Sequence, residues 1–260
     1  VVVDNKGGAG GMIGTQALKV AAPDGLTFTL SSQGSHVLTS LTQGDNLPYD
    51  PFEDFTPVAL VGRLPNVLAA RNSLEANTLP ELIELAKKET LTFGSSGVGN
   101  SPHLAGEMLN KMAGIQMSHI PYSGVGPVIV DILGGNVDMV VADMPVVVPQ
   151  VTAGEMKAIA VFATERSAAL PDVPTSVEQG YPDLLVGNYY FVLAPAGVPE
   201  DVRAKLEKAV IDACNDPAVA EKLKAAGLGA PDTGAVLATM LREEFDKWRP
   251  YVEDLNLNEN

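Results

Sequence analysis

The sequence predicts an α/β protein. Strand-like and helical segments alternate over the first 163 residues, an order typical of parallel sheets covered by helices. From residue 199 onward only helical patterns follow, so these helices must pack on a sheet built elsewhere in the chain. A chain of 260 residues with 46% hydrophobic content can bury the core of one large domain or two small ones.

The first β–α–β unit opens the chain. Its segments are a strand at residues 1–3, a helix at residues 15–22 and an alternating strand at residues 26–30. Two more strands are predicted at residues 57–61 and 67–70. Thr78, with Glu81 three positions on, forms a capping box that predicts a helix over residues 79–88.

The alternation continues through the middle of the chain. The expected strands are residues 91–94, 117–120, 137–141 and 157–163, and the expected helices are residues 102–112, 126–133 and 146–152. The C-terminal helices are predicted at residues 200–214, 217–227 and 234–247, with Pro250 stopping the last one. A chain that leaves one domain, builds a second and returns to the first would produce this order.

Charge and composition exclude several classes of protein. The formal net charge of −15 argues against nucleic acid as a partner, because Lys and Arg dominate the binding of phosphates. No apolar run approaches the ~20 residues of a membrane-spanning helix. The lone cysteine, Cys214, is expected to be a small core residue. Near-absence of cysteine fits an oxidising compartment, although a cytosolic protein could show the same count. The chain opens without an initiator methionine or a signal sequence, so we expect either a processed chain or a missing first part.

A loop rich in glycine and serine, residues 94–101, is the most informative segment. Ser101 is predicted to cap the following helix and Pro102 to occupy its first position. Backbone N–H groups at such an end attract a carboxylate or phosphate without a basic side chain, although a flexible connection has the same composition. A similar loop, residues 121–127, follows the next predicted strand, and the two loops would face one pocket.

Other candidate sites are weaker. The glycine run at residues 8–14 has the wrong spacing for a dinucleotide loop, and close packing of a helix start explains it better. His36, His103 and His119 lack metal-ligand spacing, and no catalytic set is found. Asp143 follows a predicted strand, where it could contact a ligand, cap the next helix, or do both.

Short motifs then occur in a characteristic order. They are VVDNK at residues 2–6, GAGGMIG at 8–14, APDG at 22–25, LPYDP at 47–51, DF at 54–55, SPHLAGE at 101–107, PY at 121–122, RS at 166–167, LPDVPT at 170–175 and APAG at 194–197. Together they closely resemble the solute receptors of tripartite tricarboxylate transporters, the Bug family of periplasmic binding proteins.

This resemblance implies a type II periplasmic binding fold. Each of two lobes would hold a mainly parallel sheet with flanking helices, and two crossover strands would join the lobes around a cleft. Lobe 1 would comprise residues 1–71 and 193–260, and lobe 2 residues 72–192. The family normally begins with a further strand and helix, which this sequence is expected to lack.

The resemblance also implies the ligand contacts. They are Ser32, Ser35, Ser96, Gly97, Val98, Gly99, Asn100, Ser101, Pro102, Tyr122, Ser123, Gly124, Val125, Gly126 and Asp143. Glycine and serine would donate to a carboxylate, Tyr122 would offer a ring face and a hydroxyl, and Asp143 would receive a donor group. Ser123 replaces a common lysine and Asp143 a common neutral amide, and both shift the pocket toward negative charge.

The implied function is that of a periplasmic solute receptor, not an enzyme, without cofactor or metal. It would capture a dicarboxylate, an aromatic carboxylate or an acidic amino acid and deliver it to a membrane permease of a large and a small subunit. The alternatives are a nucleotide-dependent metabolic oxidoreductase, which would need a phosphate loop and a proton-transfer residue, and a subunit that presents its ligand to a sensor.

Overall fold

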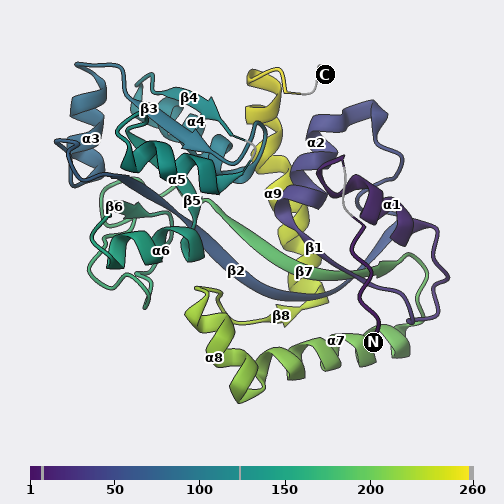
Figure 1. Cartoon of the computed structure of the whole chain (residues 1–260). Helices are drawn as coiled ribbons and strands as arrows, with labels where there is room; N and C mark the ends of the chain where they lie inside the picture. The colour runs from purple at the N-terminus through teal and green to yellow at the C-terminus, as the bar shows by residue number, and fades with distance from the viewer. Residues whose placement is uncertain (7–8, 123, 258–260) are drawn as a thin grey trace. The chain divides into compact units, whose positions relative to one another are not determined.

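The chain folds into two compact units in the computed structural model, which describes residues 1–6, 9–122 and 124–257. Unit 1 comprises Val1–Arg63, Tyr189–Lys224 and Leu228–Asn260, and unit 2 comprises Leu64–Asn188 and Ala225–Gly227. The C-terminal helices thus belong largely to the unit that the N-terminal residues begin (Figure 1).

Unit 1 is built on a sheet in which β7 lies between β1 and β2. Its strands are β1 (Thr29–Ser32), the first part of β2 (Phe55–Arg71), β7 (Gly187–Pro195) and β8 (Asp232–Thr233). The pairs β1/β7 and β2/β8 are antiparallel. Its helical segments are η1 (Ala9–Gly11), α1 (Met12–Lys19), η2 (Gly34–Leu38), α2 (Thr39–Gln43), η3 (Gly44–Asn46), α7 (Glu200–Asn215), most of α8 (Pro217–Ala225), and α9 (Gly234–Asp254).

Helices cover both faces of the unit 1 sheet. Val192 and Ala194 of β7 pack against Leu206 and Val210 of α7 on one face. Phe191, which points to the opposite face, meets the ring of His36 in η2. The alternation of side chains along β7 therefore produces two core layers from one strand.

Unit 2 contains a mixed sheet in the order β6-β2-β5-β3-β4. Its strands besides β2 are β3 (Thr92–Ser95), β4 (Ser118–Pro121), β5 (Met139–Asp143) and β6 (Met156–Val161), and its helices are α3 (Leu79–Ala86), α4 (Ser101–Ala113), α5 (Val125–Leu133) and α6 (Met144–Thr152). β3 pairs in parallel with β4 and β5, whereas β2 pairs antiparallel with β5 and β6. The α/β class is confirmed, but the pairing is mixed rather than mainly parallel, because β2 pairs antiparallel with β5, β6 and β8, and β1 pairs antiparallel with β7.

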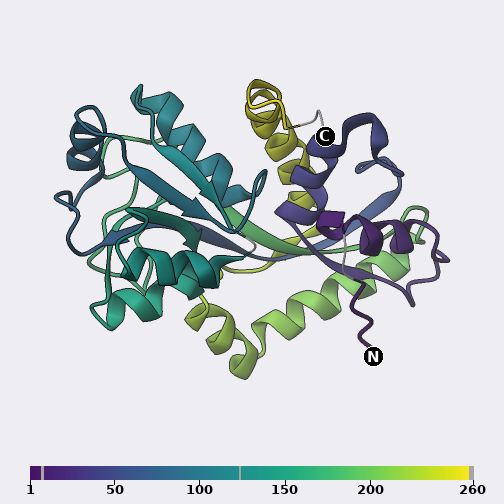
Figure 2. The same cartoon turned by 45° about the horizontal axis from the view of Figure 1, so that its top comes forward.

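Two helices cover opposite faces of β3. Gly106 of α4 packs so closely on Phe93 that a Cβ there would lie 2.2 Å from the ring, whereas a Cβ on Gly94 would lie 2.4 Å from Val128 of α5. Because neighbouring residues of a strand point to opposite faces, α4 and α5 lie on either side of the sheet, as Figure 2 shows. These close contacts bring both helices near to the strand.

The N-terminal strand prediction is wrong. Residues 1–3 form no strand, and Val1, Val2 and Val3 are fully or largely exposed. An apolar run becomes a strand only when a neighbour pairs with its backbone, and no strand in the described part of the chain does so.

Two boundary predictions are also wrong. The strands expected at residues 57–61 and 67–70 are one strand, β2, because Pro65 lies between the segments that pair with β8 and β5 and so interrupts neither. Pro250 does not stop α9, which continues to Asp254. The turn after this proline buries Val252 to 1% exposure, which offsets the lost backbone hydrogen bond.

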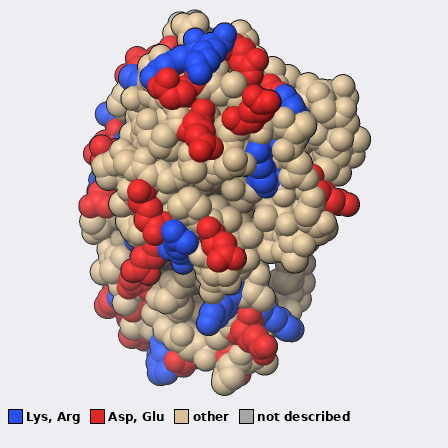
Figure 3. Space-filling model, turned by 90° about the vertical axis from the view of Figure 1, so that its left-hand side faces the viewer, with Lys and Arg blue, Asp and Glu red and all other residues tan. Residues whose placement is uncertain are grey.

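The surface carries charges of both signs, and the single cysteine is buried. Acidic and basic side chains are interspersed on the face drawn in Figure 3, with uncharged surface between them. Cys214 is confirmed as a core residue with 8% exposure, and burial raises the pKa of its thiol. Among the helices of the described residues, none is long and apolar enough to cross a membrane.

The predicted cap of α3 is confirmed. Thr78 Oγ1 accepts a hydrogen bond from the Glu81 N–H at 3.3 Å, while the Glu81 carboxylate accepts from the N–H of Asn77 at 2.7 Å. We expect Thr78→Ala to lower the free energy of unfolding by ~1 kcal/mol, because an N–H of the first turn loses its acceptor. Urea denaturation measures this loss, and Thr78→Ser, which keeps the hydroxyl, is the control. Equal midpoints for the two variants would contradict the assignment.

Candidate functional site

Three connections of unit 2 leave the same edge of its sheet. In the parallel register Ser95 of β3 lies opposite Pro121 of β4, and Gly94 lies opposite Val140 of β5. The N–H of Tyr122 donates to the Ser95 carbonyl at 3.1 Å, which joins the first two connections directly. The structure therefore brings together the two predicted loops and places Asp143 at the same edge, where ligands bind in open α/β sheets.

The first loop ends in a capped helix, but the cap is not Ser101. Asn100 is the N-cap of α4, and its Oδ1 accepts from the N–H of His103 at 3.0 Å. Its Nδ2 donates to Ser96 Oγ at 2.9 Å. Ser101 and Pro102 are the first two helical residues and are buried, because the preferred capping side chain lies one residue earlier.

Backbone donors of this loop divide into two groups. The N–H of Gly97 donates to Ser95 Oγ at 3.3 Å, and that of Gly99 to His103 Nδ1 at 3.1 Å. The N–H groups of Val98, Asn100 and Ser101 have no acceptor among the described residues. The loop therefore presents unpaired donors at the positive end of a 13-residue helix.

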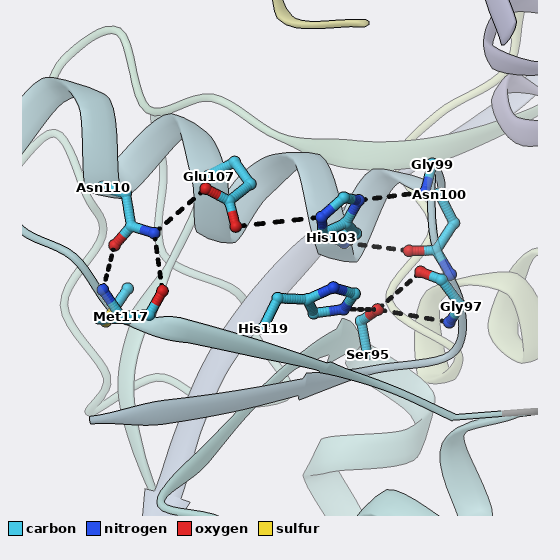
Figure 4. A network of polar contacts seen from close by, with 9 residues as sticks. All are labelled: Ser95, Gly97, Gly99, Asn100, His103, Glu107, Asn110, Met117 and His119. Carbon is cyan, nitrogen blue, oxygen red and sulfur yellow. Dashed lines mark hydrogen bonds and ion pairs between the residues drawn. The ribbon is translucent and has the colours of Figure 1, made fainter. Parts of the chain in front are cut away.

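Below the loop, two histidines stack on each other (Figure 4). The ring centroids of His103, in α4, and His119, in β4, are 3.9 Å apart. His119 Nε2 lies 2.7 Å from Ser95 Oγ, and His103 Nε2 lies 3.9 Å from Glu107 Oε1. Burial lowers the pKa of each imidazole to about 4, so both rings are neutral at neutral pH.

The second loop contributes an aromatic ring and a further helix start. Tyr122 directs its hydroxyl to Asp131 Oδ2 at 2.6 Å, and burial together with this carboxylate raises the pKa of Tyr122 to about 12. Gly124 is the N-cap of α5, Val125 its first residue, and a Cβ on Gly124 or Gly126 would meet no atom within 4 Å. Ser123 lies outside the described residues.

Asp143 occupies the N-cap position of α6, but its side chain does not cap the helix. Its Oδ1 accepts from Asn66 Nδ2 at 2.8 Å, and Asn188 is a second hydrogen-bond partner. Burial raises the pKa of Asp143, and these two amides partly oppose that shift. The structural alternative, a side-chain cap, is therefore wrong.

Asn66 and Asn188 were missed by the sequence analysis. Asn66 lies directly opposite Asp143 in the β2/β5 pairing, is fully buried, and leaves its Oδ1 without a hydrogen-bond partner among the described residues. A buried amide within the apolar segment LPNVLAA, residues 64–70, is the signal that could have identified it.

Ser32 and Ser35, the predicted contacts of unit 1, bond to each other. Ser35 Oγ lies 3.1 Å from the hydroxyls of both Ser31 and Ser32, and it accepts from the N–H of Ser32 at 3.1 Å. A Cβ on Gly11 would lie 2.4 Å from the Cβ of Ser35. This close approach explains why a glycine occupies position 11 in the glycine run of residues 8–14. Gly7 and Gly8 lie outside the described residues.

No group of three His, Cys, Asp or Glu side chains that could hold a metal occurs among the described residues. His36 donates or accepts at Nε2 to the Pro51 carbonyl, 2.9 Å away, and burial lowers its pKa to about 4, so it serves the core of unit 1. The groups that the two loops offer to a ligand are backbone N–H and hydroxyl hydrogen-bond donors.

Comparison with known proteins identifies relatives of this chain. The model of the tripartite tricarboxylate transporter family receptor matches residues 1–257. Protein BugT of Bordetella pertussis is 33% identical over 260 residues, which cover 98% of this chain and 79% of that protein. A protein of Agrobacterium vitis from the TAR-I ttuE-ttuC' intergenic region is 36% identical over 241 residues, covering 92% and 68%.

Solved structures show the same relationship. A periplasmic transporter superposes with a TM-score of 0.85 at 35% identity, covering 100% of this chain and 87% of the other. A protein of R. palustris with adipate gives 0.84 at 28% identity, covering 97% and 85%. MatC from Rhodopseudomonas palustris, with bound malate, gives 0.79 at 33% identity, covering 94% and 85%.

The fold and the relatives together define a receptor of the periplasmic binding protein class. The chain belongs to the tripartite tricarboxylate transporter receptor family, the family of the Bug proteins.

Proposed function

We propose that this protein is a periplasmic receptor that binds a small organic acid and delivers it to the permease of a tripartite tricarboxylate transporter. The acid's carboxylate binds at the start of α4, beside the second loop of unit 2. The protein performs no chemistry on its ligand and needs neither metal nor cofactor.

The observation that carries this proposal is the set of unpaired N–H groups at Val98, Asn100 and Ser101. They lie in a loop held by glycines at φ +148° and +76°, and neither this loop nor residues 121–127 contains Lys or Arg. Fixed backbone dipoles thus supply the attraction for an anion in a chain whose net charge of −15 would repel it at long range.

Two relatives support an organic acid as the ligand. The structure of the R. palustris protein contains adipate, and that of MatC contains malate. Both are dicarboxylates, so two sets of donors are required. Tyr122 to Gly126 and Asp143 are the remaining predicted contacts on unit 2, and Ser32 and Ser35 stay predicted contacts on unit 1.

A thermal-shift screen tests the proposal. We expect at least one acid among adipate, malate, glutamate and benzoate to raise the melting temperature. At a hundredfold excess of the acid over its Kd, the folded protein should be stabilised by ~2.7 kcal/mol. NAD and NADP serve as controls for the oxidoreductase alternative. The receptor assignment would be overturned if a dinucleotide raised the melting temperature while no acid of a wider panel did so.

The hydroxyl of Tyr122 is expected to contribute little to binding. Because this hydroxyl already donates to Asp131, Tyr122→Phe should leave the Kd of the bound acid within about twofold. Tyr122→Ala, which also removes the ring, should weaken binding further. Calorimetric titration measures both, and a loss of about tenfold or more in the phenylalanine variant would show that the hydroxyl contacts the ligand.

A further inference from the structure

The stacked pair His103 and His119 connects the ligand loop to the sheet of unit 2. Each ring contacts the loop through a different nitrogen: Nδ1 of His103 meets the N–H of Gly99, and Nε2 of His119 meets Ser95 Oγ. His103 lies in α4, His119 in β4 and Ser95 in β3, so all three elements hold the loop (Figure 4).

The hydrogen bonds fix the tautomer of His103. Its Nδ1 accepts from the N–H of Gly99 and therefore carries no proton. The neutral ring then carries its proton on Nε2, which faces the Glu107 carboxylate at 3.9 Å. Protonation of Nδ1 would place two donors against each other and would release the Gly99 amide.

His119 requires the other nitrogen. Ser95 Oγ donates its single proton to the Gly97 carbonyl at 2.8 Å, so it must accept from His119 Nε2–H. The same oxygen accepts the N–H of Gly97 at 3.3 Å. A donor at Nε2 of His119 thus orients the hydroxyl that holds both polar backbone groups of Gly97.

The surroundings of the pair favour the neutral state of both rings. His103 is 6% exposed, and Phe93 lies against His119 with ring centroids 5.0 Å apart. Among the described residues, the acidic group that faces the pair is Glu107, on the helix of His103 itself; its carboxylate favours a proton on His103, but burial outweighs it and lowers the pKa of this ring. Two stacked cations at a centroid distance of 3.9 Å would repel each other with little solvent between them.

We infer that His103 and His119 are positioning residues for ligand binding, which hold the loop of residues 96–101 in the conformation that presents its free N–H groups to the acid. This inference rests on the proposed function of that loop. The two rings act as an acceptor at Nδ1 and a donor at Nε2, respectively, and do not touch the ligand.

Matched amide substitutions test this assignment, because asparagine places its polar group near the position of Nδ1 and glutamine near that of Nε2. We expect His103→Asn to bind with a Kd within about threefold of the parent and His103→Gln to lose about tenfold. At His119 the order reverses, so that His119→Gln retains binding and His119→Asn loses it. The probe is the acid with the lowest Kd in the thermal-shift screen, with adipate and malate tried first.

Amide hydrogen exchange of the ligand-free variants gives a second readout. Gly99 should lose protection in His103→Gln, and Gly97 should lose it in His119→Asn, while α4 stays protected in all four variants. If asparagine and glutamine have the same effect at each position, the rings merely fill space and the assignment is overturned. A parent chain that binds no acid of the panel would instead overturn the proposed function, and the positioning role with it.

Discussion

Replacing Gly99 by aspartate is expected to abolish the ligand-induced rise in melting temperature. The new carboxylate would lie beside the free N–H groups of Asn100 and Ser101 at the positive end of α4. It would accept those hydrogen bonds itself and repel the acid. The parent gains ~2.7 kcal/mol at a hundredfold excess of ligand over its Kd, and the variant should gain nothing measurable.

Gly99→Asn is the matched control for this experiment. Gly99 has φ +76°, a conformation that Asn and Asp tolerate better than other non-glycine residues. Both variants therefore carry similar backbone strain, and they differ in charge. We expect the asparagine variant to keep a reduced shift, and a full shift in a folded aspartate variant would place the carboxylate elsewhere.

The second large effect is expected at Asp143. Asp143→Asn keeps an oxygen that can accept from Asn66, so the fold should remain intact. If the carboxylate receives the ammonium group of an amino-acid ligand, the variant should bind glutamate more weakly by ~1.5–3 kcal/mol. The same loss of negative charge should tighten the binding of adipate, a plain dianion.

Calorimetric titration of parent and variant with both acids decides the role of Asp143. Opposite changes for glutamate and adipate would place the carboxylate at the ligand. Unchanged affinity for both would remove Asp143 from the site and leave it as a structural link between β2 and β5.

The pH dependence of stability provides an independent check on Asp143. Burial raises the pKa of this carboxyl, so the folded protein takes up its proton more readily than the unfolded chain. Its stabilising contribution is therefore present at low pH and is lost as the pH rises through the folded pKa. Relative to the parent, Asp143→Asn should become more stable between about pH 3 and pH 7, as measured by urea denaturation. A constant difference across that interval would contradict the shift.

Local signals made much of the fold predictable. The Thr78 cap and the alternation of segments depend on residues close in sequence, and both predict the helices α3 to α6 to within a few residues. The strand predicted at residues 1–3 does not form because a strand depends on its partner. The prediction wrongly divided β2 into two strands, because a proline such as Pro65 breaks a strand only where the pairing needs a backbone N–H at that position. Long-range pairing is not visible in a single sequence.

The candidate site was predictable to the same extent as the fold: its local patterns were visible in the sequence, and its long-range contacts were not. The two loops could be identified from Gly and Ser between a strand and a helix, which is a local pattern. The partners of those loops could not, because Asn66 meets Asp143 through strand register, and His119 meets Ser95 across the β3/β4 pair. Assigning the cap to Ser101 failed because Asn100, one position earlier, is at least as good a capping residue.

The chain order of the strands also governs how the two units can fold. Thr29 of β1 pairs with Leu193 of β7, and the sheet of unit 1 places β7 between β1 and β2. The strands β3 to β6 lie between these two partners in the sequence, so the β1/β7 pair is a long-range contact. Unit 2, whose strands are nearly contiguous in sequence, can close its sheet before that pair forms. Until β7 joins it, the edge of β1 is open to pairing with another chain, and aggregation during refolding is the consequence of this strand order.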